Sequence, residues 1–447
     1  MNKHICKIYA PVETFSGYGA RSRDFVRSLI KLKGEEWDIK IISCRWGETP
    51  MNYLDIHNEK WGFLREYILK EPLTHQPDYM FWITIPSEAQ IWGKYNILVT
   101  AGIESTICDP SWIEGINRMD LTLVSSEHSK NVFLNSKFDK QENGVKIGEL
   151  KVEKPIEVLF EGCDLDIYRA FNPNKSFGVA GSVKTYKEEK QFDLSQIPEK
   201  FLFLTVGHYI GNAILGEDRK NIGLTIKAFL ETFKNVQNPP ALLLKTSGAS
   251  ASYIDRDNIL RKYYNVKNTV QGKLPNVYIL HGDLSDEEMN SLYNHPKVKA
   301  MVSLTKGEGY GRPLAEFSLV KKPIIASGWS GQLDFLNPEF TVLLKGQLHE
   351  IHPSAIVDKI LIQGAKWFAP DFRDTQNYMK DIYKNYKKYQ ELAKRQSNFT
   401  KVNFSWNKMH QRLGEILENY IMVPKVVELK IPKITFPQKK TEKSITF

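Results

Sequence analysis

The sequence has no run of eighteen or more apolar residues, so we expect no transmembrane helix. Residues 1–7 lead directly into a strand-like segment, without the apolar stretch of a signal peptide. The four cysteines are far apart and form no Cys-x-x-Cys pair, which argues against a zinc site and a disulfide framework. There is also no repeat of short period. These absences predict a cytoplasmic protein.

The composition is that of a large globular protein. A chain of 447 residues is long enough for two domains with a core each. Apolar residues make up 42% and charged residues 25%, which is ordinary for such proteins. The net charge of +9 is compatible with an anionic partner, such as nucleic acid, an acidic glycan or a membrane surface, but does not require one.

Continuous apolar segments alternate with helical patterns in two series. The strand-like segments of the first series are residues 5–10, 38–43, 79–85, 96–100, 121–125 and 156–160. Those of the second series are residues 201–206, 241–245, 277–281, 300–304 and 323–326. Apolar strands separated by helices are typical of parallel sheets that are covered on both faces. We therefore predict an α/β fold with two doubly wound, Rossmann-like domains in series.

The most distinctive segment is residues 305–316, which follows an apolar strand. A strand that ends in a glycine-rich turn and continues as a helix presents free backbone N–H groups, which favour phosphate. Glu308 lies in the turn, and Glu316 lies about one turn into a helix whose first position suits Pro313. The segment therefore predicts a nucleotide-sugar site. The alternative is a glycine-rich turn that only caps a structural helix.

Five residues of this segment, Glu308, Gly309, Gly311, Pro313 and Glu316, resemble the E-x7-E signature of the retaining glycosyltransferases of family 4. That family is also called glycosyl transferases group 1 and has the two-domain GT-B fold. The resemblance implies that a sugar, most simply a hexose, is transferred from a UDP- or GDP-linked donor with retention of configuration. It implies no metal ion and no other cofactor.

The same resemblance assigns roles within the segment. Glu308 would lie against the donor sugar as a catalytic residue, and Glu316 would accept hydrogen bonds from the ribose hydroxyls. Gly309, Tyr310 and Gly311 would offer their amides to the sugar and the phosphates. Leu314 would pack nearby.

Cations for the diphosphate are expected in the loop that follows residues 201–206. Family members usually have an arginine at the end of this strand and a Lys-Gly pair at the next helix. Here His208 stands in the place of the arginine, while Lys220 keeps the lysine position. Fixed cations stabilise a departing nucleoside diphosphate, so Lys220 is predicted to be catalytic with Glu308. Arg219 and His208 both remain candidates for the second positive group, and Lys245 is a further one.

Three other segments extend the resemblance. Gly17 and Gly19 follow the first strand, in a loop before a helix expected at residues 20–33. They are predicted to face the donor, the alternative being a tight turn. Ser125 and Ser126 lie in a strand-to-helix turn that resembles the acceptor side. Many family members carry a histidine after the strand at residues 96–100, where this chain has Glu104, so Glu104 is the acceptor-side candidate there.

The predicted organisation has five parts. Residues 1–171 form the acceptor-side domain, residues 172–200 a polar linker or insertion, and residues 201–405 the nucleotide-sugar domain. Residues 406–420 form a helix that crosses back to the first domain. Residues 421–447 form a basic extended arm, because three prolines interrupt the segment.

Two other functions stay open. The chain could be a non-catalytic binding protein on a GT-B fold, since a fold does not determine activity. It could also be a glycosyltransferase that acts on modified bases of DNA, which the positive charge and the basic C-terminal end allow. The acceptor (glycan, lipid or another hydroxyl compound) and the oligomeric state, including a homo-oligomer, are not determined by the sequence.

Overall fold

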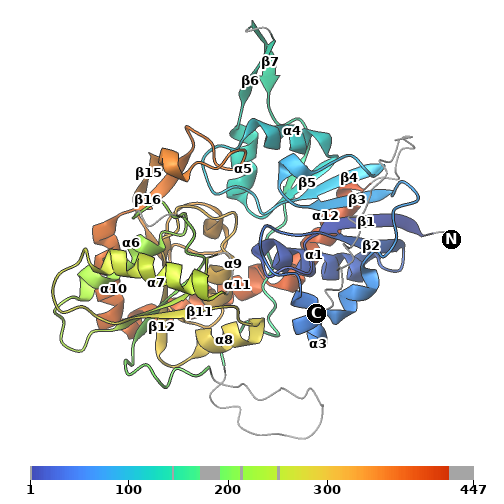
Figure 1. Ribbon diagram of the computed structural model, residues 1–447. Helices are drawn as coiled ribbons and strands as arrows, with labels where there is room; N and C mark the ends of the chain where they lie inside the picture. Colours follow the sequence, from blue (N-terminus) through green and yellow to red (C-terminus); the bar gives the residue numbers. More distant parts are fainter. Residues whose placement is uncertain (1–2, 143–144, 172–191, 212–214, 249–251, 422–447) are drawn as a thin grey trace, which may run out of the picture.

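The computed structural model describes residues 3–142, 145–171, 192–211, 215–248 and 252–421 (Figure 1). Most of the predicted linker, residues 172–191, and nearly all of the predicted arm, residues 422–447, lie outside the described residues. Within the described ranges, no helix is long and apolar enough to cross a membrane.

The first domain is built on a six-stranded parallel sheet with the strand order β2-β1-β3-β4-β5-β8. The strands are β1 (His4–Ala10), β2 (Trp37–Ser43), β3 (Tyr79–Ile83), β4 (Tyr95–Val99), β5 (Leu121–Val124) and β8 (Ile156–Val158). The helices and 3-10 helices between them are α1 (Gly17–Lys33), α2 (Tyr53–Ile56), α3 (Asn58–Trp61), η1 (Gly62–Tyr67), η2 (Pro86–Glu88), α4 (Pro110–Arg118) and α5 (Glu127–Asn135). Every residue of β3 is buried, because helices cover both faces of the sheet.

The second domain repeats this plan with the strand order β11-β10-β9-β12-β13-β14. Its strands are β9 (Leu202–Val206), β10 (Ala241–Thr246), β11 (Val277–His281), β12 (Val298–Ser303), β13 (Ile324–Ser327) and β14 (Val342–Leu344). The helices and 3-10 helices that go with them are α6 (Ile222–Phe233), α7 (Tyr253–Lys267), α8 (Asp286–Asn294), α9 (Arg312–Ser318), η3 (Gly331–Asp334), η4 (Pro353–Ala355), α10 (Phe372–Lys384) and α11 (Tyr386–Asn403). The predicted α/β class with two doubly wound parallel sheets is confirmed.

Strand order reverses once in each sheet, between β1 and β3 in the first and between β9 and β12 in the second. At such a point the loops that follow neighbouring strands turn away to opposite faces, and ligands of open parallel sheets bind there. The loop after β9 and the loop after β12 therefore begin side by side, which places residues 207–211 and 215–221 near residues 304–311.

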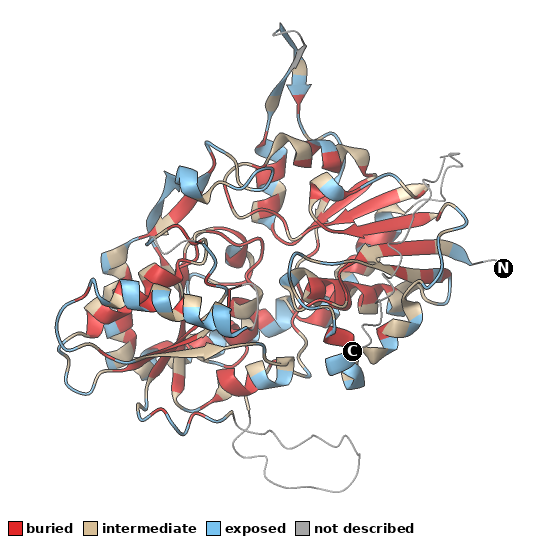
Figure 2. Ribbon diagram, in the orientation of Figure 1, coloured by how far each residue is buried: buried red, intermediate tan, exposed pale blue. Residues whose placement is uncertain are grey.

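Two antiparallel hairpins were not predicted. One is β6 (Phe138–Glu142) with β7 (Val145–Leu150), which projects from the first domain (Figure 1). The other is β15 (Gly346–Glu350) with β16 (Lys366–Pro370). All five residues of β15 are exposed, so this strand carries no apolar pattern by which sequence reasoning could have found it. Figure 2 shows the contrast between the exposed hairpin β6–β7 and the buried strands of the two sheets.

The last described helix, α12 (Trp406–Tyr420), packs on the first domain although it follows the second in the chain (Figure 1). Trp406, Met409 and Leu413 belong to the apolar cluster that also contains Phe25 and Leu29 of α1. The chain thus joins the two domains a second time, which limits how they can move apart.

Candidate active site

The glycine-rich loop after β12 is held in place by hydrogen bonds from its backbone amides to two other segments. The amide of Lys306 donates to the carbonyl of Arg219 at 2.8 Å, and the amide of Glu308 donates to Ser330 Oγ at 2.9 Å. Gly311 has a left-handed backbone (φ 101°), which favours glycine, and is the N-cap of α9 without a side-chain hydrogen bond. The amides of Gly309, Tyr310 and Gly311 have no hydrogen-bond partner among the residues that the structure describes. The loop is therefore fixed, yet keeps donors that can bind an anion.

Glu308 receives two cations from the loop in front of α6. Lys220 Nζ donates to its Oε1 at 2.5 Å, and Arg219 Nη1 lies 3.3 Å from its Oε2. Glu308 is only 7% exposed. Burial opposes the charged form, but Lys220 and then Arg219 outweigh it and lower the pKa of Glu308 to about 2. Glu308 is therefore ionised at neutral pH and cannot serve as a proton donor there.

The first domain contributes Glu104 and Ser125 to the same place. Glu104 Oε1 lies 3.5 Å from Arg219 Nη2, so two carboxylates and two cations alternate along one network. Ser125 Oγ donates to the carbonyl of Gly309 at 3.1 Å. A Cβ atom at position 309 would clash with the carbonyl oxygen of Ala101, so the close approach of the two domains requires glycine there.

Ser126, the other predicted acceptor-side residue, has a structural position. It is the N-cap of α5 and accepts a hydrogen bond from the amide of Ser129 at 3.2 Å. Its side chain is fully buried. The structure therefore separates Ser125, which reaches the glycine-rich loop, from Ser126, which begins a helix.

His208 follows β9, and Lys245 is the last residue but one of β10, so both lie at the same edge of the second sheet. His208 Nδ1 lies 3.1 Å from Ser247 Oγ, and Lys245 Nζ donates to the carbonyl of Gly282. Burial, followed by the charges of Lys220 and Lys245, lowers the pKa of His208 below 6.5. A neutral imidazole adds no fixed charge, so the geometry favours Arg219 as the second cation.

Gly17 and Gly19 lie within a helix. We expected a loop here and a helix from residue 20, but α1 begins at Gly17 because Ser16 caps it and accepts from the amide of Gly19 at 2.9 Å. The amide of Gly19 is therefore already hydrogen-bonded within the protein, rather than free to bind the donor. Gly17 is exposed.

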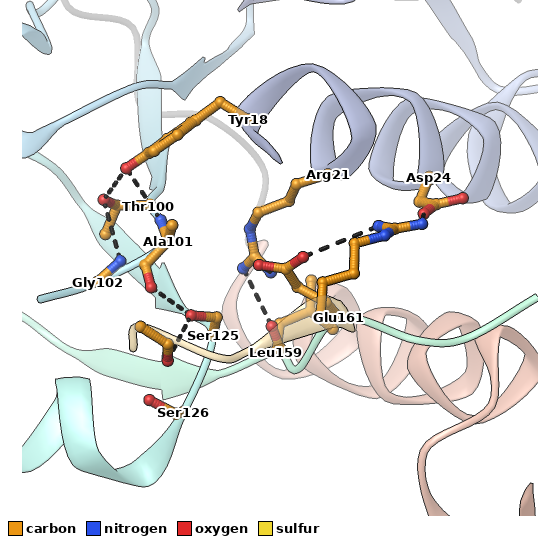
Figure 3. A network of polar contacts seen from close by, with 12 residues as sticks. Tyr18, Arg21, Asp24, Thr100, Ala101, Gly102, Ser125, Ser126, Leu159 and Glu161 are labelled. Atoms are coloured by element: carbon orange, nitrogen blue, oxygen red, sulfur yellow. Dashed lines mark hydrogen bonds and ion pairs between the residues drawn. The ribbon is translucent and has the colours of Figure 1, made fainter. Parts of the chain in front are cut away.

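Sequence reasoning missed Tyr18, which lies between these two glycines. Its hydroxyl lies 2.9 Å from Thr100 Oγ1 and accepts a hydrogen bond from the amide of Ala101 at 3.1 Å (Figure 3). Its ring stacks on Trp46 with the centroids 3.8 Å apart. Tyr18 thus fixes the segment that carries Glu104. A tyrosine in a predicted glycine-rich turn was the signal that could have identified it.

Tyr310 and Leu314 point into the core of the second domain. Tyr310 is 2% exposed and its ring packs on Phe335 with a centroid distance of 4.8 Å. Leu314 is 3% exposed and belongs to the same apolar cluster. Only the backbone of Tyr310 can serve a ligand at the loop.

Glu316 is buried and apart from the network around Glu308. Its Oε1 accepts from Arg312 Nε at 2.9 Å, and its Oε2 accepts from the Tyr293 hydroxyl at 3.3 Å. Burial raises the pKa of Glu316 to about 7, although Arg312 opposes this shift. Sequence reasoning missed Arg312, which lies four residues before Glu316. That is the spacing at which oppositely charged side chains meet on a helix.

Two Asp-x-Asp triplets occur in the chain, at residues 164–166 and 255–257. Asp164 accepts from Arg27 at 2.9 Å, and Asp255 accepts from the amide of Gly248 at 2.7 Å and lies 2.8 Å from His281 Nε2. In the described part of the chain, no three His, Cys, Asp or Glu residues are grouped so that they could hold a metal ion.

A comparison with protein-family models finds no match, and neither does a comparison with curated protein sequences. Solved structures do match. HepE of Anabaena, solved in complex with UDP and glucose, has a TM-score of 0.59 at 11% identity, covering 93% of this chain and 100% of that one. Sucrose-phosphate synthase of Thermosynechococcus elongatus has a TM-score of 0.56 at 12% identity, covering 94% and 99%. A glycosyltransferase of Rickettsia africae has a TM-score of 0.52 at 13% identity, also covering 94% and 99%. These similarities confirm the predicted fold, a GT-B fold with two Rossmann-like domains.

Proposed function

We propose that the chain is a retaining, metal-independent glycosyltransferase of the cytoplasm. It would move a sugar from a UDP- or GDP-linked donor to a hydroxyl group of a glycan, a lipid or another acceptor. The observation that carries this proposal is that Lys220 and Arg219 both pair with Glu308, beside the amides of residues 309–311, which have no hydrogen-bond partner in the described part of the chain. The UDP and glucose bound to the structurally similar HepE support this class of donor.

The two cations match the charge that develops on the leaving group. When the bond between sugar and diphosphate breaks, negative charge accumulates on the departing phosphate oxygen, and fixed positive groups stabilise it. Lys220 and Arg219 are already held in place, so little reorganisation is needed at the moment of reaction. They supply the countercharge that a divalent ion would otherwise bring, which supports transfer without a metal.

Glu308 is suited to stabilising charge on the donor sugar rather than to transferring a proton. With a pKa of about 2, its carboxylate remains charged and can stabilise positive charge at the anomeric carbon. Glu104 and Ser125 reach the same loop from the first domain. An acceptor hydroxyl that approaches from that side would meet the donor where the leaving group departs, which is the geometry that retention requires.

The test is a thermal-shift screen of UDP-, GDP- and ADP-linked sugars, followed by a transfer assay. A donor present at a hundred times its Kd stabilises the fold by about 2.7 kcal/mol. We expect one donor to stabilise the wild type and not Lys220→Ala, while Lys380→Ala, at an exposed position of α10, behaves like the wild type. Transfer should persist in excess EDTA, and NMR should show the anomeric configuration of the donor in the product.

The alternative functions predict other outcomes of the same experiments. A non-catalytic binding protein would be stabilised by a donor and would release no nucleoside diphosphate with any acceptor. A DNA-modifying transferase would bind DNA with an affinity that falls steeply with salt and would transfer sugar only to DNA. An inverted anomer, or complete loss of activity in EDTA, would contradict the proposed mechanism.

A further inference from the structure

Arg312 contacts three carboxylates at once. It is the first residue of α9, and its side chain is 19% exposed. Its Nε lies 2.9 Å from Glu316 Oε1, its Nη2 lies 2.8 Å from Asp24 Oδ2, and its Nη1 lies 3.8 Å from Glu161 Oε2. A planar guanidinium with five N–H groups is suited to such shared contacts.

These three carboxylates come from both domains. Asp24 lies on α1, and Glu161 follows β8, so both belong to the first domain, where they lie near Arg21 (Figure 3). Both are buried, at 4% and 8% exposure. Glu316 lies on α9 of the second domain with Arg312. Because buried charges require partners, moving the two domains apart would deprive Arg312 of two of its three carboxylates.

The surroundings of Glu316 make Arg312 its main source of positive charge. On α8, Tyr293 donates a hydrogen bond to Glu316, and Asp286 adds a second negative charge. Asp286 is itself paired with Lys60 at 3.5 Å and accepts from the Tyr168 hydroxyl at 3.0 Å.

The remaining groups that face Glu316 come from the segment after β8, namely the Tyr168 hydroxyl and the Cys163 thiol. Burial, followed by the negative charge of Glu316, raises the pKa of each group. Neither carries positive charge at neutral pH. In the described part of the chain, Arg312 is the cation that pairs directly with Glu316.

We infer that Arg312 is a positioning residue for the donor site: it keeps Glu316 charged and aimed, and it does so only while Asp24 and Glu161 of the first domain hold the other side of its guanidinium. This inference rests on the proposed function, in which Glu316 binds the ribose hydroxyls. Domain contact and donor binding are then coupled through one side chain, because the same guanidinium serves both.

The test compares Arg312→Leu, Arg312→Lys and Asp24→Asn, with Arg261→Leu, at an exposed position of α7, as the matched control. Donor affinity is measured between pH 6 and 9 with a nucleotide-sugar, whose diphosphate diester does not titrate in this range. Loss of the cation raises the pKa of Glu316, so Arg312→Leu should move the midpoint of donor binding upward by about 1–3 pH units and weaken binding at pH 7 about tenfold or more. Arg312→Lys should restore part of the shift. Asp24→Asn should weaken binding in the wild type and have little effect in the Arg312→Leu background.

A second readout does not need the donor. The unfolding free energy of each protein is compared with that of its Glu316→Gln variant as a function of pH. A carboxyl whose folded pKa is raised from 4.5 to about 7 destabilises the fold as the pH rises through this range, and Arg312→Leu should extend the loss to higher pH.

The outcomes separate this inference from the proposed function. In one outcome, Arg312→Leu leaves the pH midpoints of donor binding and of the unfolding free energy unchanged, while Glu316→Ala loses donor binding. This outcome would overturn the role of Arg312 and leave the proposed function standing. If Arg312→Leu does not fold, wild-type donor affinity and pH dependence in Asp24→Asn would overturn it instead. A shifted Glu316 titration in a protein that binds no nucleotide-sugar would support Arg312 as the group that keeps Glu316 charged and contradict the proposed function.

Discussion

Lys220 Nζ lies 2.5 Å from Glu308 Oε1, although the two residues belong to loops that follow different strands, β9 and β12. They meet because β9 and β12 are neighbours at the point where the strand order of the second sheet reverses. The ion pair holds Lys220 beside the glycine-rich loop, where its positive charge can meet that of a bound diphosphate. This relationship leads to the first prediction.

Lys220→Ala should weaken donor binding and lower kcat. Removing one fixed group that stabilises developing negative charge typically costs about 10²–10³ in kcat. Arg219 still pairs with Glu308 at 3.3 Å, so the loop should remain in place and the fold should persist. Steady-state kinetics and circular dichroism of Lys220→Ala and Lys380→Ala test this. Equal kcat values for the two variants would contradict the role of Lys220.

Stability at low pH should depend on Glu308. Its folded pKa of about 2 lies below the ordinary 4.5, so its contribution is complete above pH 4.5 and is lost as the pH falls toward 2. The difference corresponds to about 3 kcal/mol at neutral pH. Urea unfolding of the wild type and Glu308→Gln between pH 2 and 7 should show curves that converge at the acidic end. Parallel curves would show that Glu308 is not held by Lys220 and Arg219.

Donor binding should strengthen as the pH rises from 6 to 8, because the pKa of Glu316 is about 7 and only the carboxylate accepts two hydrogen bonds from a hydroxyl pair. Glu316→Ala should forfeit about 1.5–3 kcal/mol of donor binding. Calorimetric titration of the wild type and Glu316→Ala at several pH values measures both effects. Wild-type affinity in Glu316→Ala would remove this residue from the site.

Gly309→Ala should reduce transfer more than nucleotide binding. A Cβ atom there would clash with the carbonyl of Ala101, so the first domain must retreat from the glycine-rich loop. Lys220, the proposed nucleotide contact, lies within the second domain, so nucleotide binding should survive. Gly148→Ala is the control, since its Cβ atom would meet open space. Similar kcat values for both alanine variants would show that the close approach of the domains does not matter for transfer.

Much of the fold follows from local patterns. The continuous apolar segments predicted the parallel strands to within one or two residues, because a strand covered on both faces must be apolar along its whole length. The exception is the short edge strand β14, which was not predicted. Hairpin β15–β16 was not predicted, because β15 is exposed throughout. The position of β15 therefore depends on its hydrogen bonds to β16 rather than on the burial of apolar side chains. The start of α1 was placed three residues too late because Ser16, a capping residue, was assigned to a loop.

For the site, the sequence by itself determined the chemistry of the segments: a glycine-rich turn with Glu308, a lysine before the next helix, and glutamates at fixed spacing. These are properties of neighbouring residues, and they need no knowledge of the rest of the chain. Only the tertiary structure decided their electrostatic states. Glu308 is ionised because Arg219 and Lys220 reach it from the loop after another strand, whereas Glu316 is only about half ionised at pH 7 because burial outweighs Arg312. Ionisation inside a protein depends on the distance to other charges and to water, and both are set by residues distant in the chain.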